Sequence, residues 1–194
     1  MRLSANNLTS RNRNEIQTRF RNGLSVHQYL NPVPEILFVS SYPPRECGIA
    51  TYTTDIMKAL TKKFGNSFKL RVCPLESKHE KHEYPIGIGT SLNTDIPNDF
   101  NKIAHEINQN DRISLVIVQH EFGFFEQKEE SFIKFLQDIN KKVIVVFHTV
   151  LPNPNVDHLR NVRRISKETD SILVMTHSSA EILVRDYRIS EEKI

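Results

Sequence analysis

Polar and titratable side chains stand just past the ends of four apolar runs in this sequence of 194 residues. His120, His148 and His177 each follow one run, and Arg45 and Gly48 follow the fourth. The four runs are Ile36–Val39, Leu115–Val118, Val143–Phe147 and Ile172–Met175. In open α/β sheets, ligands bind outside the carboxyl ends of the strands. One histidine there has an ordinary structural explanation, but three at the same predicted edge favour a binding site.

The turn after the first run is suited to an anion. Pro43-Pro44 interrupts the chain after Val39, and a helical pattern begins at Cys47. The start of a helix presents unpaired N–H groups and a partial positive charge, and glycine at position 48 lets a ligand approach the backbone closely. We therefore expect this turn to bind a phosphorylated or otherwise oxygen-rich small molecule.

Several other kinds of site are disfavoured by the sequence. It contains no G-x-x-x-x-G-K-[ST] phosphate loop and no G-x-S-x-G nucleophile elbow, and Gly87-Ile88-Gly89 lacks the third glycine of a dinucleotide fingerprint. Cys47 and Cys73 form no C-x-x-C pair, so free thiols in a reducing cytosol are expected. We interpret Cys47 as a small packing residue, because no catalytic thiol framework surrounds it.

Three motifs leave alternatives open. His79-x-x-His82 has the spacing of metal ligands, but its charged surroundings favour a solvated loop over zinc. Phe122, Phe124 and Phe125 would suit either a sugar-stacking patch or, more commonly, burial under the next helix. His120 and Glu121 could be an acid/base pair, but adjacent strand residues point to opposite faces, so only one of them can face a given ligand.

The spacing of apolar residues predicts strands that alternate with helices from residue 35 onward. We expect strands at about 35–41, 68–72, 84–88, 115–118, 143–147 and 172–175. We expect helices at about 49–64, 97–107, 128–139 and 156–167, and a last one capped by Ser178 or Ser179 that reaches Tyr187. Gly65-Asn66 should end the first helix, and Pro97 suits the first turn of the second. The β-branched runs do not alternate, so the pattern predicts an α/β fold with a doubly wound, mostly parallel sheet.

Charge divides the chain at about residue 34. Residues 1–34 hold five Arg against one Glu, whereas the other 160 residues hold 21 basic and 22 acidic side chains. We expect 1–34 to be a mobile polar tail, with contact to an acidic membrane surface or a partner as the alternative. The rest predicts no nucleic-acid binding. The apolar runs are too short to span a bilayer and no signal peptide is apparent, so a cytoplasmic protein is expected.

Three motifs and a closing stretch stand out between about Glu35 and Ile194. They are Tyr42-Pro43-Pro44-Arg45-Glu46-Cys47-Gly48-Ile49-Ala50-Thr51-Tyr52 with Asp55, Gln119-His120-Glu121-Phe122-Gly123, Phe147-His148-Thr149-Val150-Leu151, and Thr169–Val174 with Ser178 and the residues from Tyr187 to Ile194. In these motifs the sequence resembles the N-terminal domain of family 4 retaining glycosyltransferases, which have the GT-B fold.

This resemblance implies that a sugar is transferred from a nucleotide-sugar to a sugar or glycan acceptor with retention at the anomeric carbon. By analogy, the amides of Gly48 and Ile49 would meet the donor diphosphate, and His148 would hold the donor sugar at the reacting centre. The acceptor side would be formed by Arg45, His120, Glu121 and Thr149. The nucleotide-sugar is a substrate, so neither a cofactor nor a metal is implied.

The resemblance also implies a second α/β domain, which in this family holds most of the nucleotide contacts. The sequence ends where the interdomain linker would begin, so we expect 35–194 to be the acceptor-side domain, inactive without a donor domain. We also expect self-association, or pairing with a complementing donor domain, because apolar surface would be left uncovered. The alternative is a non-catalytic sugar- or phosphate-binding module with a Rossmann-like fold.

Overall fold

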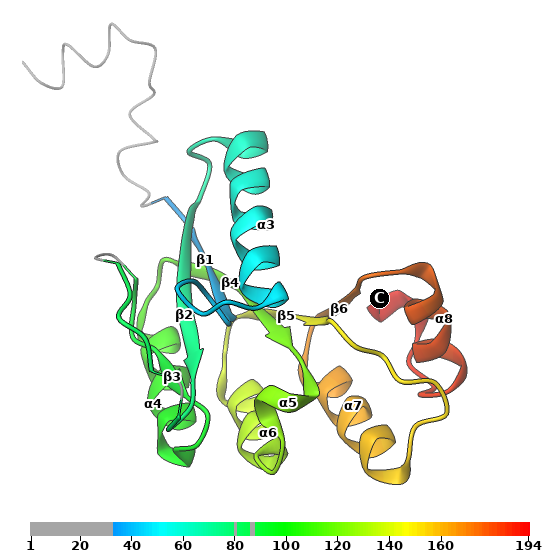
Figure 1. Cartoon of the computed structure of the whole chain (residues 1–194). Coiled ribbons are helices and arrows are strands. Elements are labelled where there is room, and N and C mark those ends of the chain that lie inside the picture. The colour runs from blue at the N-terminus through cyan, green and yellow to red at the C-terminus, as the bar shows by residue number, and fades with distance from the viewer. Residues whose placement is uncertain (1–32, 80, 86–87) are drawn as a thin grey trace, which may run out of the picture. The chain divides into compact units, whose positions relative to one another are not determined.

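A computed structural model describes residues 33–79, 81–85 and 88–194. The tail predicted for residues 1–34 therefore lies almost entirely outside the described residues. The described chain forms one six-stranded sheet, in the order β3-β2-β1-β4-β5-β6, in which every pair of neighbouring strands is parallel (Figure 1). This confirms the predicted α/β class and the doubly wound, parallel sheet. No helix within the described ranges combines the length and the apolar character needed to cross a bilayer.

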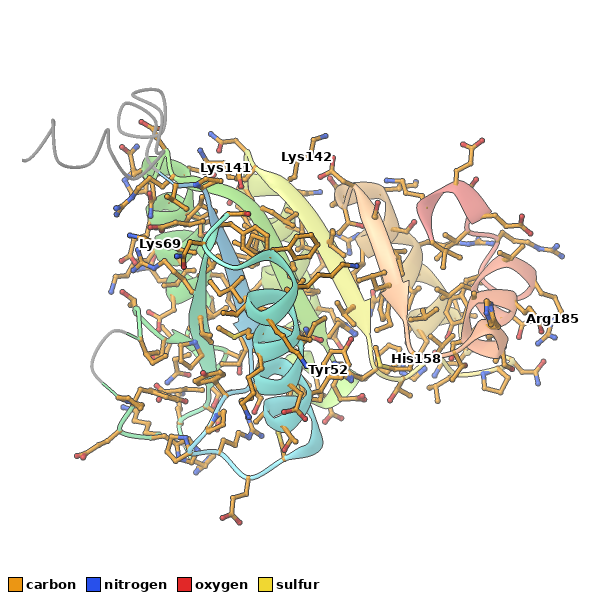
Figure 2. The ribbon with its side chains drawn as sticks, turned by 90° about the horizontal axis from the view of Figure 1, so that it is seen from above. Tyr52, Lys69, Lys141, Lys142, His158 and Arg185 are labelled. Atoms are coloured by element: carbon orange, nitrogen blue, oxygen red, sulfur yellow. The ribbon has the colours of Figure 1, made fainter. Side chains whose placement is uncertain are left out.

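The strands agree with the buried apolar runs of the sequence. They are β1 (Glu35–Ser40), β2 (Lys69–Glu76), β3 (Leu92–Asn93), β4 (Ile113–His120), β5 (Lys142–Phe147) and β6 (Ser171–Val174). Figure 2 shows Lys69 and Lys142 at the amino ends of β2 and β5, whereas Tyr52 and His158 lie toward the carboxyl ends.

The helices are α3 (Gly48–Phe64), α4 (Pro97–Gln109), α5 (Phe122–Phe125), α6 (Glu129–Asp138), α7 (Val156–Glu168) and α8 (His177–Arg185), followed by the short 3₁₀ helix η1 (Glu191–Lys193). Pro97 opens α4 and Gly65, with a φ of 57°, ends α3, as predicted. The cap of α8 differs from the prediction: the Thr176 hydroxyl accepts the N–H of Ser179, so the capping residue is Thr176 rather than Ser178 or Ser179.

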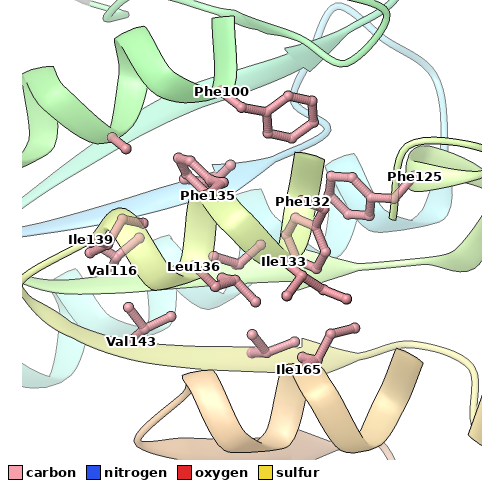
Figure 3. Packing of buried hydrophobic residues seen from close by; sticks show 14 of the residues in the cluster. Phe100, Val116, Phe125, Phe132, Ile133, Phe135, Leu136, Ile139, Val143 and Ile165 are labelled. Carbon is pink, nitrogen blue, oxygen red and sulfur yellow. The ribbon is translucent and has the colours of Figure 1, made fainter. Parts of the chain in front are cut away.

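The two faces of the sheet have separate cores. Helices α4, α6 and α7 pack one after another along one face, which we call the three-helix face; α3 packs on the other face, which we call the α3 face. Phe132, Phe135 and Leu136 of α6 fill the larger core, together with Val116 and Val143 of the sheet (Figure 3). Phe38, Val72, Ile117 and Val146 form the smaller core beneath α3.

Two strand predictions were wrong in position. β2 runs four residues beyond Val72 and passes through Pro74, where a break would be expected. Pro74 is tolerated because β2 pairs with β3 only from Leu75 onward. The predicted short strand near Tyr84 does not form among the described residues there, and β3 lies instead at Leu92–Asn93, paired with the end of β2.

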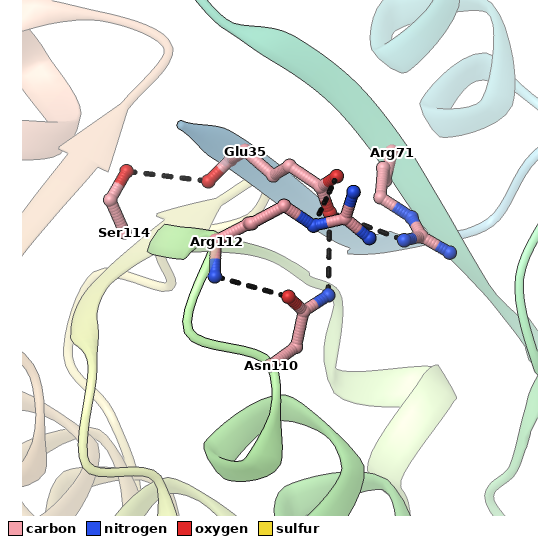
Figure 4. A network of polar contacts seen from close by, with 5 residues as sticks. All are labelled: Glu35, Arg71, Asn110, Arg112 and Ser114. Atoms are coloured by element: carbon pink, nitrogen blue, oxygen red, sulfur yellow. Dashed lines mark hydrogen bonds and ion pairs between the residues drawn. The ribbon is translucent and has the colours of Figure 1, made fainter. Parts of the chain in front are cut away.

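A buried carboxylate ties the strands together at their amino ends (Figure 4). Glu35 is 2% exposed, and its oxygens lie 3.2 Å from Arg71 Nη1, 3.4 Å from Arg112 Nε and 3.3 Å from Asn110 Nδ2. These residues belong to β1, β2 and the loop before β4. The cluster therefore holds the amino ends of the central strands together, whereas the predicted site lies at their carboxyl ends.

Candidate functional site

The reversal of strand order lies between β1 and β4. From β1 the chain moves outward to β2 and β3, and then returns to β4 on the other side of β1 before continuing to β5 and β6. Connections that diverge in this way leave a crevice at the carboxyl ends of the two central strands. The loop 41–47 follows β1 there, and Glu121 follows β4. The first and second motifs of the sequence thus stand next to each other.

The first turn of α3 leaves two backbone amides available. The Sγ atom of Cys47 accepts the N–H of Ala50 at 3.4 Å and lies 3.0 Å from the Ser41 hydroxyl oxygen. Cys47 is therefore the helix cap, which the interpretation as a packing residue missed. The N–H groups of Gly48 and Ile49 donate no hydrogen bond to any described residue. A Cβ atom added at Gly48 would meet nothing within 4 Å, so a ligand has open access to this backbone.

His148 lies immediately after β5, on the α3 face. Its Nε2 is 2.7 Å from Oε1 of Gln119. The rings of His148 and Tyr52 pack edge to face, with their centroids 5.1 Å apart. Tyr52 is one helical turn beyond Gly48, so His148 contacts the same end of α3 that carries the available amides. Burial lowers the pKa of His148, and the nearby Glu121 charge opposes this shift only in part, so the imidazole is neutral at physiological pH.

Gln119 fixes the tautomer of His148. Gln119 is fully buried, and its Oε1 faces His148 Nε2. An amide oxygen only accepts hydrogen bonds, so Nε2 carries the ring proton and Nδ1 remains a hydrogen-bond acceptor. The sequence pattern did not single out Gln119 for this role, although its place at the end of β4, beside β5, was visible in the strand-end rule.

Glu121 and Thr149 are also brought together. The Thr149 hydroxyl donates to Glu121 Oε2 at 2.6 Å, and the N–H of Phe122 donates to Glu121 Oε1 at 3.1 Å. Both side chains are half-buried, and they join the residues that follow β4 to those that follow β5. The carboxylate is thus held in place beside His148.

The sequence predicted that His120 shares one binding site with Gly48 and His148. This prediction was wrong, because His120 lies apart from the other two. Its ring points to the three-helix face, is 3% exposed, and lies 5.5 Å from Phe125 and 4.8 Å from Phe147 between ring centroids. The physical reason is the alternation of side chains along β4, which sends Gln119 to the α3 face and His120 to the opposite one. Burial, with a smaller effect of His148, lowers the pKa of His120 to about 3.

Arg45 lies at a separate polar hollow. Its guanidinium carbon is 5.1 Å from the ring centroid of Phe124, and both residues line a cavity of about 120 Å³. Glu76, the last residue of β2, lines it as well and accepts hydrogen bonds from the Ser91 hydroxyl and the His82 N–H. Sequence reasoning missed Glu76 because it ended β2 before Pro74; with the correct end, the strand-end rule would have found it.

The three phenylalanines after β4 were expected either to form an exposed patch for a sugar or to be buried, and they differ from one another in burial. Phe125 is buried, whereas Phe122 and Phe124 are half-buried and pack at the margin of the core. Among the residues that the structure describes, no group of three or more His, Cys, Asp or Glu side chains could hold a metal ion.

The fold of the described residues is similar to part of a solved glucosyltransferase. An alpha-glucosyltransferase in complex with UDP and a 13-mer DNA containing an HMU base matches with a TM-score of 0.50 and 15% sequence identity, over 80% of this chain and 40% of that chain. An alpha-glucosyltransferase in complex with UDP and a 13-mer DNA with a central A:G mismatch matches with a TM-score of 0.48 and 13% identity, over 72% of this chain and 36% of that one. No protein-family model and no curated protein matches the sequence.

At these identities the likeness concerns the fold. The described residues form a Rossmann-like α/β domain of the kind that GT-B glycosyltransferases contain. This chain spans at most 40% of the length of the structures named above.

Proposed function

We propose that this chain is the acceptor-side domain of a retaining GT-B glycosyltransferase of family 4, which transfers a sugar from a nucleotide-sugar to a sugar or glycan. The observation that carries the proposal is the cluster at the β1–β4 reversal. There, the available amides of Gly48 and Ile49 lie in the first turn of α3. Tyr52, at the same end of the helix, packs against His148.

Each group has a role in this proposal. The Gly48 and Ile49 amides stabilise the negative charge that builds on the leaving diphosphate as the bond to the anomeric carbon breaks. His148, neutral and oriented by Gln119, accepts a hydrogen bond from a donor-sugar hydroxyl through Nδ1 and holds the sugar at the reacting centre. Such contacts accelerate transfer by positioning the reactants and need no proton to be exchanged at His148.

The acceptor side consists of Glu121 and Thr149, with Arg45 at the neighbouring hollow. The Glu121 carboxylate is suited to accept hydrogen bonds from sugar hydroxyls, and the Arg45 guanidinium to meet an anionic group. His120 leaves this set because its ring is buried on the other face. Residues 35–194 have almost no net charge, which favours a carbohydrate acceptor over a nucleic acid.

The nucleotide itself needs further contacts. We propose that a second α/β domain, in the same polypeptide or in another, supplies them and closes over the cluster, since the chain matches less than half of the solved transferases. On its own, the chain should bind nucleotide-sugars weakly. Tight binding of a nucleotide-sugar by the 194 residues would contradict this division of roles.

A pyrophosphate titration tests the anion site directly. Inorganic pyrophosphate added to the ¹⁵N-labelled chain should shift the amide resonances of Gly48 and Ile49 before any others. Gly48→Ala places a methyl group in the open space over the backbone and should weaken binding at least fivefold, whereas Gly65→Ala makes the same change at the other end of α3 and should not. Shifts that appear elsewhere, or equal effects of both variants, would refute the site.

Transfer is measured in the presence of a candidate donor domain, by nucleoside-diphosphate release from a panel of nucleotide-sugars with and without sugar acceptors. Acceptor-dependent release that falls at least 100-fold in His148→Ala supports the proposal. Sugar binding without release, even in the presence of a candidate donor domain, would instead identify a non-catalytic binding module.

A further inference from the structure

A cavity of about 240 Å³ lies on the three-helix face, between the end of β4 and helices α5, α6 and α7. It is independent of the cluster around His148, which faces α3. The lining residues are His120, Phe122, Gly123, Phe125, Glu126, Glu129, Phe132, Ile133, His158, Asn161 and Ile165. An apolar cavity of about 150 Å³ is enough to hold benzene in another protein, so this one has room for a ring-sized body.

Aromatic rings form much of its wall. Phe122 and His158 lie with ring centroids 4.7 Å apart and planes 30° apart, which joins the end of β4 to the first turn of α7. Phe125 stacks on Phe132 at 3.9 Å, and the His120 ring stacks on Phe125 at 5.5 Å. Such rings offer an apolar surface on which the ring of a ligand can pack.

The charged groups of the wall are both acidic. Glu126 and Glu129 line the cavity and make no hydrogen bond or ion pair with another described residue. Glu129 also opens α6, where the helix dipole stabilises its charge, but Glu126 lies outside any helix. No Lys or Arg is among the lining residues, so the lining carries two acidic side chains and no compensating cation. Glu129 is half-buried and Glu126 is exposed.

The deepest polar group of the wall is also unpartnered. His120 is 3% exposed, and its Nδ1 makes no hydrogen bond to any described residue. A buried polar atom without a partner costs free energy, and such atoms are uncommon in folded proteins. The wall of the cavity therefore contains a polar group that the fold leaves unpaired.

We propose that this cavity binds a small organic ammonium ion, with a ring-sized body packed against the phenylalanines and its charge placed between Glu126 and Glu129. An uncharged ligand would leave the carboxylates uncompensated, and an anion would be repelled by them. An amino sugar and an aromatic amine share this chemistry.

Titration of the full chain with benzylammonium chloride, followed by NMR or calorimetry, tests the proposal. Benzyl alcohol at the same ionic strength is the uncharged control. Benzylammonium should bind at least tenfold more tightly, and Glu126→Gln and Glu129→Gln should each weaken its binding at least threefold. Glu130→Gln removes the same charge from the same helix turn, but Glu130 pairs with Arg164 outside the cavity, so binding should not change.

Equal binding of the amine and the alcohol, or equal effects of the three glutamine variants, would overturn the proposal. These variants alter half-buried or exposed side chains, so loss of folding does not confuse the result. Glucosamine, compared with glucose, distinguishes the two sources: preference for glucosamine over benzylammonium indicates an amino sugar, and the reverse indicates an aromatic amine. Since His148 is on the other face, His148→Ala should leave amine binding intact even if transfer is lost.

Discussion

His120 and His148 stand at the ends of neighbouring strands, yet the structure gives them different surroundings. The ring of His120 is enclosed by phenylalanines, whereas that of His148 is half-buried and has a hydrogen-bond partner in Gln119. Burial lowers the pKa of both imidazoles, and the shift is larger for His120. Both rings are therefore neutral near pH 7, which makes them hydrogen-bonding groups rather than charges.

The lowered pKa of His120 should make the protein less stable in acid. In the unfolded chain this imidazole binds a proton below pH of about 6.5, but in the folded chain only near pH 3. As the pH falls from about 6.5 toward 3, the free energy of unfolding should thus decrease by up to about 1.4 kcal/mol per pH unit. Above about pH 6.5 this loss should disappear. His148 adds a smaller loss of the same sign.

Denaturant unfolding at several pH values checks this expectation. His120→Phe keeps an aromatic ring in the cluster and should flatten the pH dependence between about pH 6.5 and 4. His79→Asn alters an exposed histidine and should keep the wild-type slope. Parallel curves for wild type and His120→Phe would show that His120 is not the group responsible.

The two cysteines should differ in reactivity. Burial raises the pKa of the Cys73 thiol to about 12, whereas Cys47 is half-buried at the start of α3. A thiol reagent should modify one cysteine in the native protein and the second only after unfolding. Cys47→Ser, which keeps a good capping residue, should abolish the native reaction. Rapid reaction in that variant would contradict the assignment.

At the scale of elements, α3 connects the candidate site to the rest of the domain. Its start carries the Gly48 and Ile49 amides, its first two turns bury Ala50 and Thr53, and Gly65 ends it. The Thr53 hydroxyl lies 2.7 Å from that of Ser40 in β1, which fixes the helix over the strand. The position of the amides therefore depends on how the first two turns of α3 pack on the sheet.

The two glycines at the ends of α3 should respond differently to alanine. Gly65 has a φ of 57°, which an L residue adopts at a cost, so Gly65→Ala should destabilise the protein by about 1 kcal/mol. Gly48 has no such conformation and open space around it, so Gly48→Ala should change stability by less than about 0.5 kcal/mol. Thermal and denaturant unfolding measure both, and a reversed order would contradict the described caps.

For the described domain as a whole, the two ends of the sheet have separate tasks. The carboxyl end carries the candidate site, and the amino end holds the buried Glu35 cluster. Glu35→Ala should destabilise the protein by about 2 kcal/mol, since three donors lose their common acceptor. Lys142→Met at the same end removes an exposed ion pair with Asp170 and should have no measurable effect on unfolding. Equal losses in the two variants would contradict a special role for Glu35.

Self-association stays a prediction. Leu173 and Met175, at and just after the edge strand β6, are 44% and 40% exposed, which leaves apolar surface at one side of the sheet. Sedimentation velocity should show reversible association that increases with concentration. Leu173→Thr with Met175→Gln should weaken it, and a monomer at high concentration would refute the expectation.

The sequence by itself determined the order of the elements and most of their positions. Buried strands are unbroken apolar runs, and helices have apolar residues every three or four positions. Gly65 marks the end of α3 and Pro97 the start of α4. All of these signals are local in the sequence. For the same reason, the sequence placed Gly48, Glu121, His148 and Thr149 at one edge of a parallel sheet. The strand at Leu92–Asn93 was missed because two residues carry no periodicity of their own.

Only the tertiary structure decided which of these residues meet. The covering of one face by α3 and of the other by α4, α6 and α7 sends Gln119 to His148 and His120 into the phenylalanine cluster. Pairing with β1 and β3 carries β2 through Pro74 to Glu76. Such outcomes depend on strand register and on contacts between residues far apart in the chain, and no local pattern of residues encodes them.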